Sequence, residues 1–423
     1  MVSWSVARVS TPWDGLIWWK RVPRPRYDRP AGTAQLTGSD SKPPLDDRGL
    51  LARLIGFDTT SRTSNLPLVD FLSNYLERPD VRILRNPSAD GTKTNLVVIA
   101  GPGTPDRGGL VLSGHMDVVP AEELDWRSDP FTLFDGGDRY VGRGTADMKG
   151  FLALAANRMA GIDPAALRHS LVLLFTYDEE VGTLGARRFT ESYAQLERLP
   201  RNVVIGEPTE LRVVRGHKGM LRLRLAFSGR AAHSGYPHLG QSAIEPAARA
   251  ITALTALGHT MEAERPPNAD AFPAVPFATL NVGTVAGGSA ANVIPDHCEI
   301  QLGIRLLPGM AAKAMTERVR ATVREAVSDP FTLEVLTESP AMVLDAGAPI
   351  LQTLCEATGE PEAHSVMFAT DAGWLQSAGF DCVLFGPGSI EVAHQANEFL
   401  PADQFRRAGE ILDGLIRRSC FEA

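Results

Sequence analysis

Short apolar runs alternate with segments of helical periodicity through the first half of the chain. Apolar residues at positions 50, 51, 54 and 55 share one helical stripe, and Asp46 or Asp47 before them is a suitable N-cap. Strands are predicted over residues 95–100, 109–113, 170–176 and 202–205, and further helices over 65–76, 150–160 and a segment that begins at 185. Strands that are separated by helices favour an α/β sheet covered on both faces.

The pattern of polar positions changes near residue 212. Residues 221–227 alternate strictly, which predicts a strand with one solvated face. An amphipathic helix over 244–254, strands over 278–285 and 297–307, a helix over 310–327 and a strand over 332–336 follow it. The resulting βαββαβ order is typical of the split ferredoxin-like unit.

The α/β pattern then resumes, with a helix over 350–358, a strand over 381–385 and a terminal helix over 403–420. The βαββαβ unit is therefore predicted to be inserted into a discontinuous domain with a mixed sheet. We expect a catalytic domain formed by residues 46–211 and 339–423, and an inserted lid formed by residues 212–338.

Residues 1–45 differ from both predicted domains. They carry seven Lys or Arg against three Asp, and four of the six Trp lie in the first 19 residues. Asp14 and Lys20 interrupt the only apolar patch, so the h-region of a secretory signal is missing. We interpret the segment as an irregular extension, with a docking or targeting arm as the alternative.

Composition narrows the class of protein. The chain has 423 residues, of which 44% are hydrophobic and 22% charged, so it can bury a sizeable core. Its net charge of -8 argues against a nucleic-acid partner, because a phosphate-binding surface needs clustered Lys and Arg. No apolar run approaches the ~18 residues of a membrane span, so no membrane partner is expected. The four cysteines form no CxxC pair and are typical of reduced thiols, which predicts a cytoplasmic protein.

Side chains of metal-ligating types follow the predicted strands, where sites collect in α/β sheets. They are His115 and Asp117 after 109–113, Asp147 before the helix 150–160, Asp178, Glu179 and Glu180 after 170–176, Glu207 after 202–205, and His394 after 381–385. Taken singly, each has a simpler explanation, such as a loop histidine, a helix N-cap at Asp147, or a solvated acidic turn. Three adjacent carboxylates repel one another, however, and a dication would offset that repulsion.

The combined set favours a metal centre. The candidate ligands are His115, Asp147, Glu180, Glu207 and His394. All are nitrogen or oxygen donors, which suits two zinc-like ions bridged by one carboxylate. Two ions ~3.5–4 Å apart can share a water and lower its pKa toward ~7. Glu179 is adjacent to a ligand yet uncommitted, so it is the candidate general base. Asp117 is expected to accept a hydrogen bond from the second ring nitrogen of His115.

Five segments carry these residues in a recognisable order. They are His115-Met-Asp117, Gly142-Arg-Gly-Thr-Ala-Asp147-Met-Lys-Gly150, Asp178-Glu179-Glu180, Gly206-Glu207-Pro208 and Asn292-Val-Ile-Pro295. In order, spacing and context they resemble the M20 family of co-catalytic zinc aminoacylases and exopeptidases, with matching motifs from about residue 57 to 399. Within this family, segments 57–65, 217–219, 280–284 and 386–395 are most similar to the acetylornithine deacetylase group.

This resemblance implies a zinc-exopeptidase-like catalytic domain that carries a ferredoxin-like lid, with the lid forming a homodimer. The expected reaction is the dizinc-dependent hydrolysis of N2-acetyl-L-ornithine to L-ornithine and acetate, a step of arginine biosynthesis, with Co2+ able to replace Zn2+. The substrate is then a small N-acyl amino acid. His115 and Glu207 would hold one zinc ion, Glu180 and His394 the other, and Asp147 would bridge them.

The resemblance also implies roles around the metal ions. Glu179 would activate the bridging water, and His233 would reach the active site of the partner subunit to stabilise the oxyanion. Asn292 and Arg305 on the lid would contact the substrate carboxylate or the oxyanion. The stretch that contains Gly386 and Gly388 would offer backbone N–H groups nearby.

One position departs from the pattern of this group. Thr370-Asp371-Ala372 stands where Thr-Glu-Ala is expected, so Asp371 keeps the acid with one methylene fewer. If Asp371 contacts the terminal amine of the substrate, its reach changes. The alternatives are a succinyl-diaminopimelate desuccinylase, an N-acyl amino-acid deacylase or a dipeptidase of the same family, and a non-catalytic metal-binding relative. No G-x-S-x-G elbow or G-x-x-x-x-G-K-[ST] loop occurs, which argues against serine hydrolases and P-loop proteins.

Overall fold

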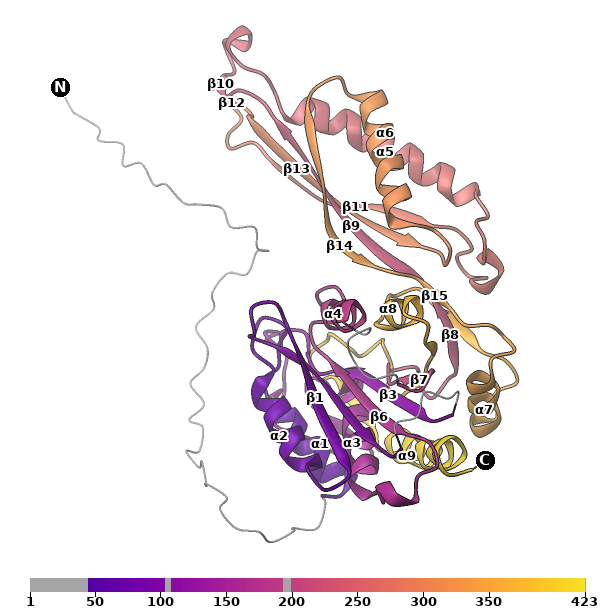
Figure 1. Ribbon diagram of the computed structural model, residues 1–423. Helices are drawn as coiled ribbons and strands as arrows, with labels where there is room; N and C mark the ends of the chain where they lie inside the picture. The colour runs from indigo at the N-terminus through magenta and orange to yellow at the C-terminus, as the bar shows by residue number, and fades with distance from the viewer. Residues whose placement is uncertain (1–44, 103–107, 193–198, 423) are drawn as a thin grey trace, which may run out of the picture. The chain divides into compact units, whose positions relative to one another are not determined.

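The structure is a computed structural model, and it describes residues 45–102, 108–192 and 199–422. The extension expected over residues 1–45 lies outside this part of the chain, apart from its last residue. Within the described ranges the fold is of the mixed α/β class, with a smaller α/β unit inserted into a larger one (Figure 1). The fold class expected from the sequence is therefore confirmed. No helix in these ranges is long and apolar enough to span a bilayer.

A nine-stranded mixed sheet forms the centre of the larger unit. Its order is β1-β2-β6-β3-β7-β17-β8-β15, with β16 paired to β8, and the four adjacent strands β6, β3, β7 and β17 are parallel. The strands are β1 (Val81–Pro87), β2 (Thr94–Ala100), β3 (Leu110–His115), β6 (Leu171–Thr176), β7 (Asn202–Ile205), β8 (Val214–His217), β15 (Met342–Val343), β16 (His364–Val366) and β17 (Asp381–Leu384). Every residue of β2, β3 and β6 is buried, which is why these strands read as continuous apolar runs.

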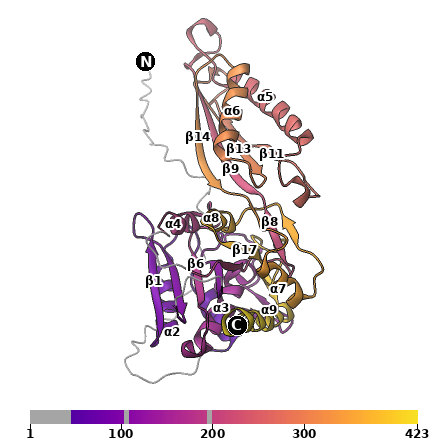
Figure 2. The same cartoon turned by 45° about the vertical axis from the view of Figure 1, so that its right-hand side comes forward.

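Helices cover both faces of this sheet. α1, α2, α3 and α9 pack together on one face, and α4 and α8 pack together on the other (Figures 1 and 2). Their bounds, with that of α7, are α1 (Asp47–Ile55), α2 (Leu66–Leu76), α3 (Gly150–Gly161), α4 (Leu184–Ser192), α7 (Pro349–Thr358), α8 (Ala372–Ser377) and α9 (Ala402–Ile416). The predicted cap of α1 is present, because the Asp46 carboxylate accepts a hydrogen bond from the Gly49 N–H at 2.6 Å.

The inserted unit is a four-stranded antiparallel sheet that packs against two helices. Its order is β11-β13-β9-β14, and α5 lies beside α6 in Figures 1 and 2. The elements are β9 (Gly219–Ser228), α5 (Ile244–Ala263), β11 (Thr279–Gly287), β13 (His297–Leu306), α6 (Ala312–Ala326) and β14 (Phe331–Ser339). Alternate residues of β9, from Leu221 to Phe227, are buried in the core of this unit, as the alternating pattern predicts. The sequence of elements is the ferredoxin-like order.

The first and last residues of the inserted sheet differ from the expected limits of the lid. Its four strands lie within residues 219–339, whereas β8, which is inside the expected range of 212–338, pairs with β17 of the larger sheet. β8 has only four residues and is followed almost directly by β9, so no polar loop marks the change of sheet. The division of the chain at 212 and 338 stays a prediction.

Two small sheets complete the described fold. β18 (Phe399–Pro401), β5 (Arg139–Val141) and β4 (Phe134–Asp135) form one, and β10 (Ala232–His233) and β12 (Val293–Ile294) form the other. The first joins the segment after His394 to the segment before Asp147, because β18 pairs with β5. The second joins the two segments of the inserted unit that contain His233 and Asn292.

Candidate metal centre

The candidate ligands lie where the parallel strands of the larger sheet end. His115 is the last residue of β3 and pairs with Thr176, the last residue of β6. Glu207 follows β7 across Gly206, and the loop that contains Glu180 follows β6. Because the carboxyl ends of parallel strands meet at one edge of a sheet, side chains from segments far apart in sequence converge there.

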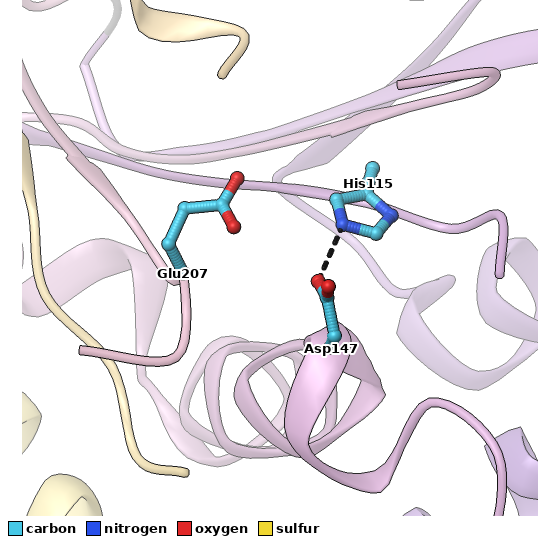
Figure 3. A group of neighbouring side chains, drawn as sticks. All are labelled: His115, Asp147 and Glu207. Carbon is cyan, nitrogen blue, oxygen red and sulfur yellow. Dashed lines mark hydrogen bonds and ion pairs between the residues drawn. The ribbon is translucent and has the colours of Figure 1, made fainter. Parts of the chain in front are cut away.

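Asp147 lies between two groups of ligand-type side chains. One group joins it to His115 and Glu207, and the other to Glu180 and His394, with one ligand atom of each residue within 4.8 Å of the others in its group. Oδ1 of Asp147 is 2.9 Å from Nε2 of His115, and Oδ2 is 3.3 Å from Nε2 of His394. Nε2 of His394 is also 3.0 Å from Oε1 of Glu180. Figure 3 shows the first group, in which the Glu207 carboxylate points toward the His115–Asp147 contact.

The two groups differ in exposure. His115, Asp147 and Glu207 are 1%, 5% and 4% exposed, whereas the His394 side chain is 48% exposed. The second group is therefore open to solvent through His394, since the side chains of Glu180 and Asp147 are 8% and 6% exposed. Backbone angles in the left-handed region occur at His394, with φ 63°, and at Asp178, with φ 54°. Such angles are uncommon for residues other than glycine and concentrate at functional sites.

The hydrogen bonds of His115 show what the first group requires. Its Nδ1–H donates to the Asp117 carbonyl oxygen at 2.8 Å, so in the neutral ring the lone pair of Nε2 faces the Asp147 carboxylate. A nitrogen lone pair and a carboxylate oxygen 2.9 Å apart repel each other unless a proton or a metal ion lies between them. Burial lowers the pKa of His115, but the hydrogen bond and charge of Asp147 outweigh it and hold the pKa well above 6.5. Contacts with Asp147 and Glu180 raise the pKa of His394 to about 10. Both imidazoles thus lie where positive charge is favoured.

The carboxylates of the centre repel one another. Burial, followed by the charge of Asp147, raises the pKa of Glu207 well above 4.5, and the same two causes raise the pKa of Glu180. The pKa of Asp147 itself is lowered, because contacts with His115 and His394 outweigh its burial. Buried anions at this density are stabilised by a cation, and nitrogen and oxygen donors are the ligands of zinc and related divalent ions. The residues therefore fit a pair of metal ions that shares Asp147.

Glu179 is next in sequence to a ligand but belongs to neither ligand group within the described ranges. Its backbone N–H donates to Oδ1 of Asp117 at 3.0 Å, which fixes the start of the loop that contains it. Burial, followed by the charge of Glu207, raises the pKa of Glu179 well above 4.5. A carboxyl group whose pKa is displaced upward in this way has the property that general acid–base catalysis requires.

Asp117 contacts His115 differently from the expectation. The ring Nδ1–H donates to the carbonyl oxygen of Asp117, and the nearest carboxylate oxygen is 3.6 Å away. The carboxylate instead accepts from the N–H groups of Glu179 at 3.0 Å and Glu180 at 3.2 Å, and from Ser61 Oγ at 2.7 Å. The backbone carbonyl of Asp117 therefore orients the His115 ring. The carboxylate of Asp117 orients the loop that contains Glu179 and Glu180.

Asp371 is more deeply buried than a side chain that contacts a substrate would be. It is 2% exposed, and its Oδ2 accepts a hydrogen bond from Thr176 Oγ1 at 2.5 Å. Burial raises the pKa of Asp371 to about 6, against the lowering effect of that hydrogen bond. A substrate amine could reach this carboxylate only after side-chain movement, so the expected contact stays a prediction.

The N–H groups at Gly386 and Gly388 are engaged within the protein. Gly386 N–H donates to Thr209 Oγ1 at 3.2 Å, and Gly388 N–H donates to Gln404 Oε1 at 2.9 Å. Side chains from other segments already accept from both N–H groups, and the expected contact of this stretch with a substrate stays a prediction. Gly386 also has a packing role. A Cβ added there would be 2.5 Å from the carbonyl oxygen of Glu207, so the two loops approach more closely than another residue would allow.

Three predicted residues lie on the inserted unit. His233 is exposed on β10, pairs with Val293 and lies near Asn292, whose carbonyl oxygen accepts from the Ser234 N–H at 2.9 Å. No hydrogen bond or ion pair joins His233 or Asn292 to the ligand groups among the described residues. Arg305 on β13 is half-buried, and burial lowers its pKa, with the charge of Glu179 acting in the opposite direction.

Sequence reasoning missed two buried residues beside the centre. The Glu398 carboxylate accepts from the Asp147 N–H at 3.0 Å. Lys149 donates to the Phe57 carbonyl oxygen at 2.7 Å, and burial lowers its pKa to about 7. Their positions were available as a signal, because Lys149 lies in the segment that ends at Gly150 and Glu398 ends the region of matching motifs.

A ligand cluster at the carboxyl edge of an α/β sheet, combined with an inserted ferredoxin-like unit, defines a class of two-domain metalloenzymes. The model of "Peptidase family M20/M25/M40" matches residues 111–418, and the chain belongs to this family. It is therefore a metal-dependent hydrolase that acts on amide bonds. The resemblance drawn from the motifs is confirmed.

Relatives and solved structures agree with this membership. The chain is 35% identical to an acetylornithine deacetylase of Myxococcus xanthus over 90% of this chain and 99% of that protein. It is 36% identical to an acetylornithine deacetylase of Proteus mirabilis (strain HI4320) over 86% of this chain and 92% of that one. An M20 family metallo-carboxypeptidase from Sulfolobus solfataricus has a TM-score of 0.72 at 16% identity, covering 88% of this chain and 98% of its own. A dinuclear metal-binding M20 peptidase from Bacillus subtilis has a TM-score of 0.60 at 17% identity, covering 87% and 98%. At these identities the two structures show the shared fold.

Proposed function

We propose that this chain hydrolyses N2-acetyl-L-ornithine to L-ornithine and acetate, as a step of arginine biosynthesis. The observation that carries the proposal is the sharing of Asp147 by two ligand groups, which suits a pair of zinc ions. The substrate is supported by the names of relatives that are 35% and 36% identical over most of the chain. The reaction would take place in the cytoplasm, which is supported by four free cysteines.

Zinc is the ion proposed for both positions, with Co2+ as a substitute. His115 and Glu207 would hold one ion, Glu180 and His394 would hold the other, and Asp147 would contact both. When bound, the ions supply Lewis acidity that polarises an amide carbonyl and lowers the pKa of a coordinated water. The chain's contribution is to hold these five side chains at one edge of the sheet.

Glu179 is the proposed general base and general acid. Its carboxylate would take a proton from the attacking water and later donate that proton to the departing amine. The raised pKa of Glu179 supports this role, because a more basic carboxylate accepts a proton more readily. Asp117 supports it as well, since its carboxylate holds the Glu179 N–H at 3.0 Å.

The inserted unit is proposed to act as a lid and to form a homodimer. His233 would donate a hydrogen bond to the oxyanion in the active site of the partner subunit. Asn292 and Arg305 would contact the substrate carboxylate or the oxyanion. The dimer is supported by β11, which is an edge strand of its sheet and has Val285 53% exposed. An unpaired strand edge is suited to association with a second copy.

A turnover screen tests the substrate. Zinc-loaded and cobalt-loaded protein would be assayed with N-acetylornithine, N-acetylmethionine, N-succinyl-diaminopimelate and a dipeptide. We expect the highest kcat/KM with N-acetylornithine. Preference for another substrate would refute the assignment of N-acetylornithine and leave the proposed hydrolytic chemistry in place. A fully metal-loaded protein that turns over none of the four would favour a non-catalytic metal-binding relative.

A further inference from the structure

A buried ion pair contacts the backbone of the loop that contains Asp147. Glu398 and Arg143 each have side chains that are 1% exposed, and Arg143 Nη1 is 2.9 Å from Glu398 Oε2. Neither residue belongs to a ligand group in the described part of the chain. A buried pair of this kind is costly to desolvate, so its contacts with the surrounding loops decide what it does.

The Glu398 carboxylate is bound to the backbone of the loop that contains the shared ligand. Oε1 accepts from the N–H groups of Ala146 at 2.9 Å and of Asp147 at 3.0 Å. Oε2 accepts from the Gly144 N–H at 3.0 Å, in addition to Arg143. One carboxylate therefore holds three backbone amides across four residues, and one of these amides belongs to Asp147 itself.

The Arg143 guanidinium connects this loop to the loops of two other site residues. Nη1 also donates to the carbonyl oxygen of Gln395, which follows His394, at 3.2 Å. Nη2 donates to the carbonyl oxygen of Pro120 at 3.1 Å and to Glu123 Oε1 at 2.8 Å, in the segment that continues from His115. The planar fork of arginine can make these contacts simultaneously, which a lysine ammonium cannot.

We propose that Glu398 and Arg143 are positioning residues that set the distance between the two ligand groups. Glu398 fixes the backbone from which the Asp147 carboxylate reaches both groups, and Arg143 ties that backbone to the loop of His394. The inference rests on the metal assignment of the proposed function and on no particular substrate. Partners of this kind commonly change metal affinity by ~10–100-fold when they are removed.

Glu398→Gln is the first test. The substitution keeps the side-chain volume but replaces one acceptor oxygen with an NH2 group, which must then face a backbone N–H or the Arg143 guanidinium. Glu391→Gln is the matched control, because Glu391 is an exposed carboxylate of the same loop. Three quantities would be measured on the full chain: zinc bound after dialysis, zinc affinity by competition with a chelator, and the visible absorption spectrum of the Co2+ form.

We expect Glu398→Gln to bind zinc ~10–100-fold more weakly and to show an altered Co2+ spectrum. The control should match the wild-type protein in all three measurements. Circular dichroism of the metal-free proteins would establish that the variant is folded. A folded Glu398→Gln protein with wild-type zinc affinity and an unchanged Co2+ spectrum would overturn the proposal.

Arg143→Lys provides a second test if Glu398→Gln does not fold. The lysine keeps the charge beside Glu398 but cannot also hold Gln395, Pro120 and Glu123. We expect weaker zinc binding in the same direction, and wild-type affinity would again overturn the proposal. These measurements use no substrate. A protein that ignores N-acetylornithine yet loses zinc in both variants would refute the proposed function and leave this inference standing.

Discussion

Replacing Glu179 with glutamine should abolish most turnover without removing the metal ions. The glutamine side chain has the same size but cannot accept a proton from water. Glu179 belongs to neither ligand group in the described ranges, and its backbone N–H would keep its 3.0 Å hydrogen bond to Asp117. Metal content should therefore stay at the wild-type level while catalysis is lost.

The expected loss follows from what else could serve as the base. Positioned general bases contribute ~10²–10⁴-fold in rate, which corresponds to about 3–5 kcal/mol of activation free energy. Asp371 belongs to neither ligand group in the described ranges and its charge acts on Glu179, but it is 2% exposed and its carboxylate accepts a hydrogen bond from Thr176. It is poorly placed to replace Glu179, so we expect a loss near the upper end of that range.

The assay is the rate of amine release from N-acetylornithine, measured together with zinc per chain by mass spectrometry. Wild-type activity should decline at acidic pH, because Glu179 accepts no proton once it is protonated and its pKa is raised above 4.5. The residual activity of the variant should lack this decline. Glu180→Gln is the contrasting variant, since it removes a ligand and should lower metal content as well. Wild-type kcat in Glu179→Gln would refute the assigned role.

Three further outcomes are expected. Removal of metal by a chelator should abolish hydrolysis and added Zn2+ or Co2+ should restore it, and full activity in protein shown to contain no metal would contradict the mechanism. Gly386→Ala should destabilise the protein by about 1–3 kcal/mol and weaken metal binding, because the added Cβ would be 2.5 Å from the Glu207 carbonyl oxygen. Gly161→Ala is the control and should change neither quantity, because its added Cβ would have no neighbour within 4 Å. Asp371→Asn should raise the unfolding free energy of the metal-free protein by up to about 3 kcal/mol at neutral pH and by little near pH 4. Burial raises the pKa of Asp371 from 3.8 to about 6 in the folded protein, so the ionised carboxyl group lowers stability as pH rises through that interval. Urea unfolding at both pH values measures the difference, and equal stability at neutral pH would contradict the reasoning.

The fold and the candidate ligands were predictable because the residue types and patterns that indicate them are local in the sequence. Strands whose residues are all buried, such as β3 and β6, read as unbroken apolar runs, and a polar residue directly after such a run is conspicuous. His115 and the acidic turn that contains Glu180 were selected as candidates in this way. β8 was missed, because it has four residues, includes a glycine and leads almost directly into the alternating pattern of β9.

Contacts between remote segments could not be read from the sequence. The sequence of the Gly386 segment does not show that the Gly386 N–H already donates to Thr209. The sequence around Asp371 does not show that its carboxylate accepts a hydrogen bond from Thr176. In both cases the residue type was informative, but the hydrogen-bond partner comes from a segment that is remote in the sequence.

The same limit explains why the pairing of Glu398 with Arg143 could not be read from the sequence, although both residues lie in or beside the matching motifs. The two residues are 255 positions apart, and an isolated glutamate or arginine in a polar loop is ordinarily a solvated residue. Yet the ligand groups themselves are assembled from loops that are equally remote, since His115, Asp147 and His394 share no secondary-structure element. Local sequence can supply ligands of the correct type, but their separation must be fixed by contacts between the loops. We therefore expect the buried groups that bridge those loops to determine the geometry of the proposed metal site.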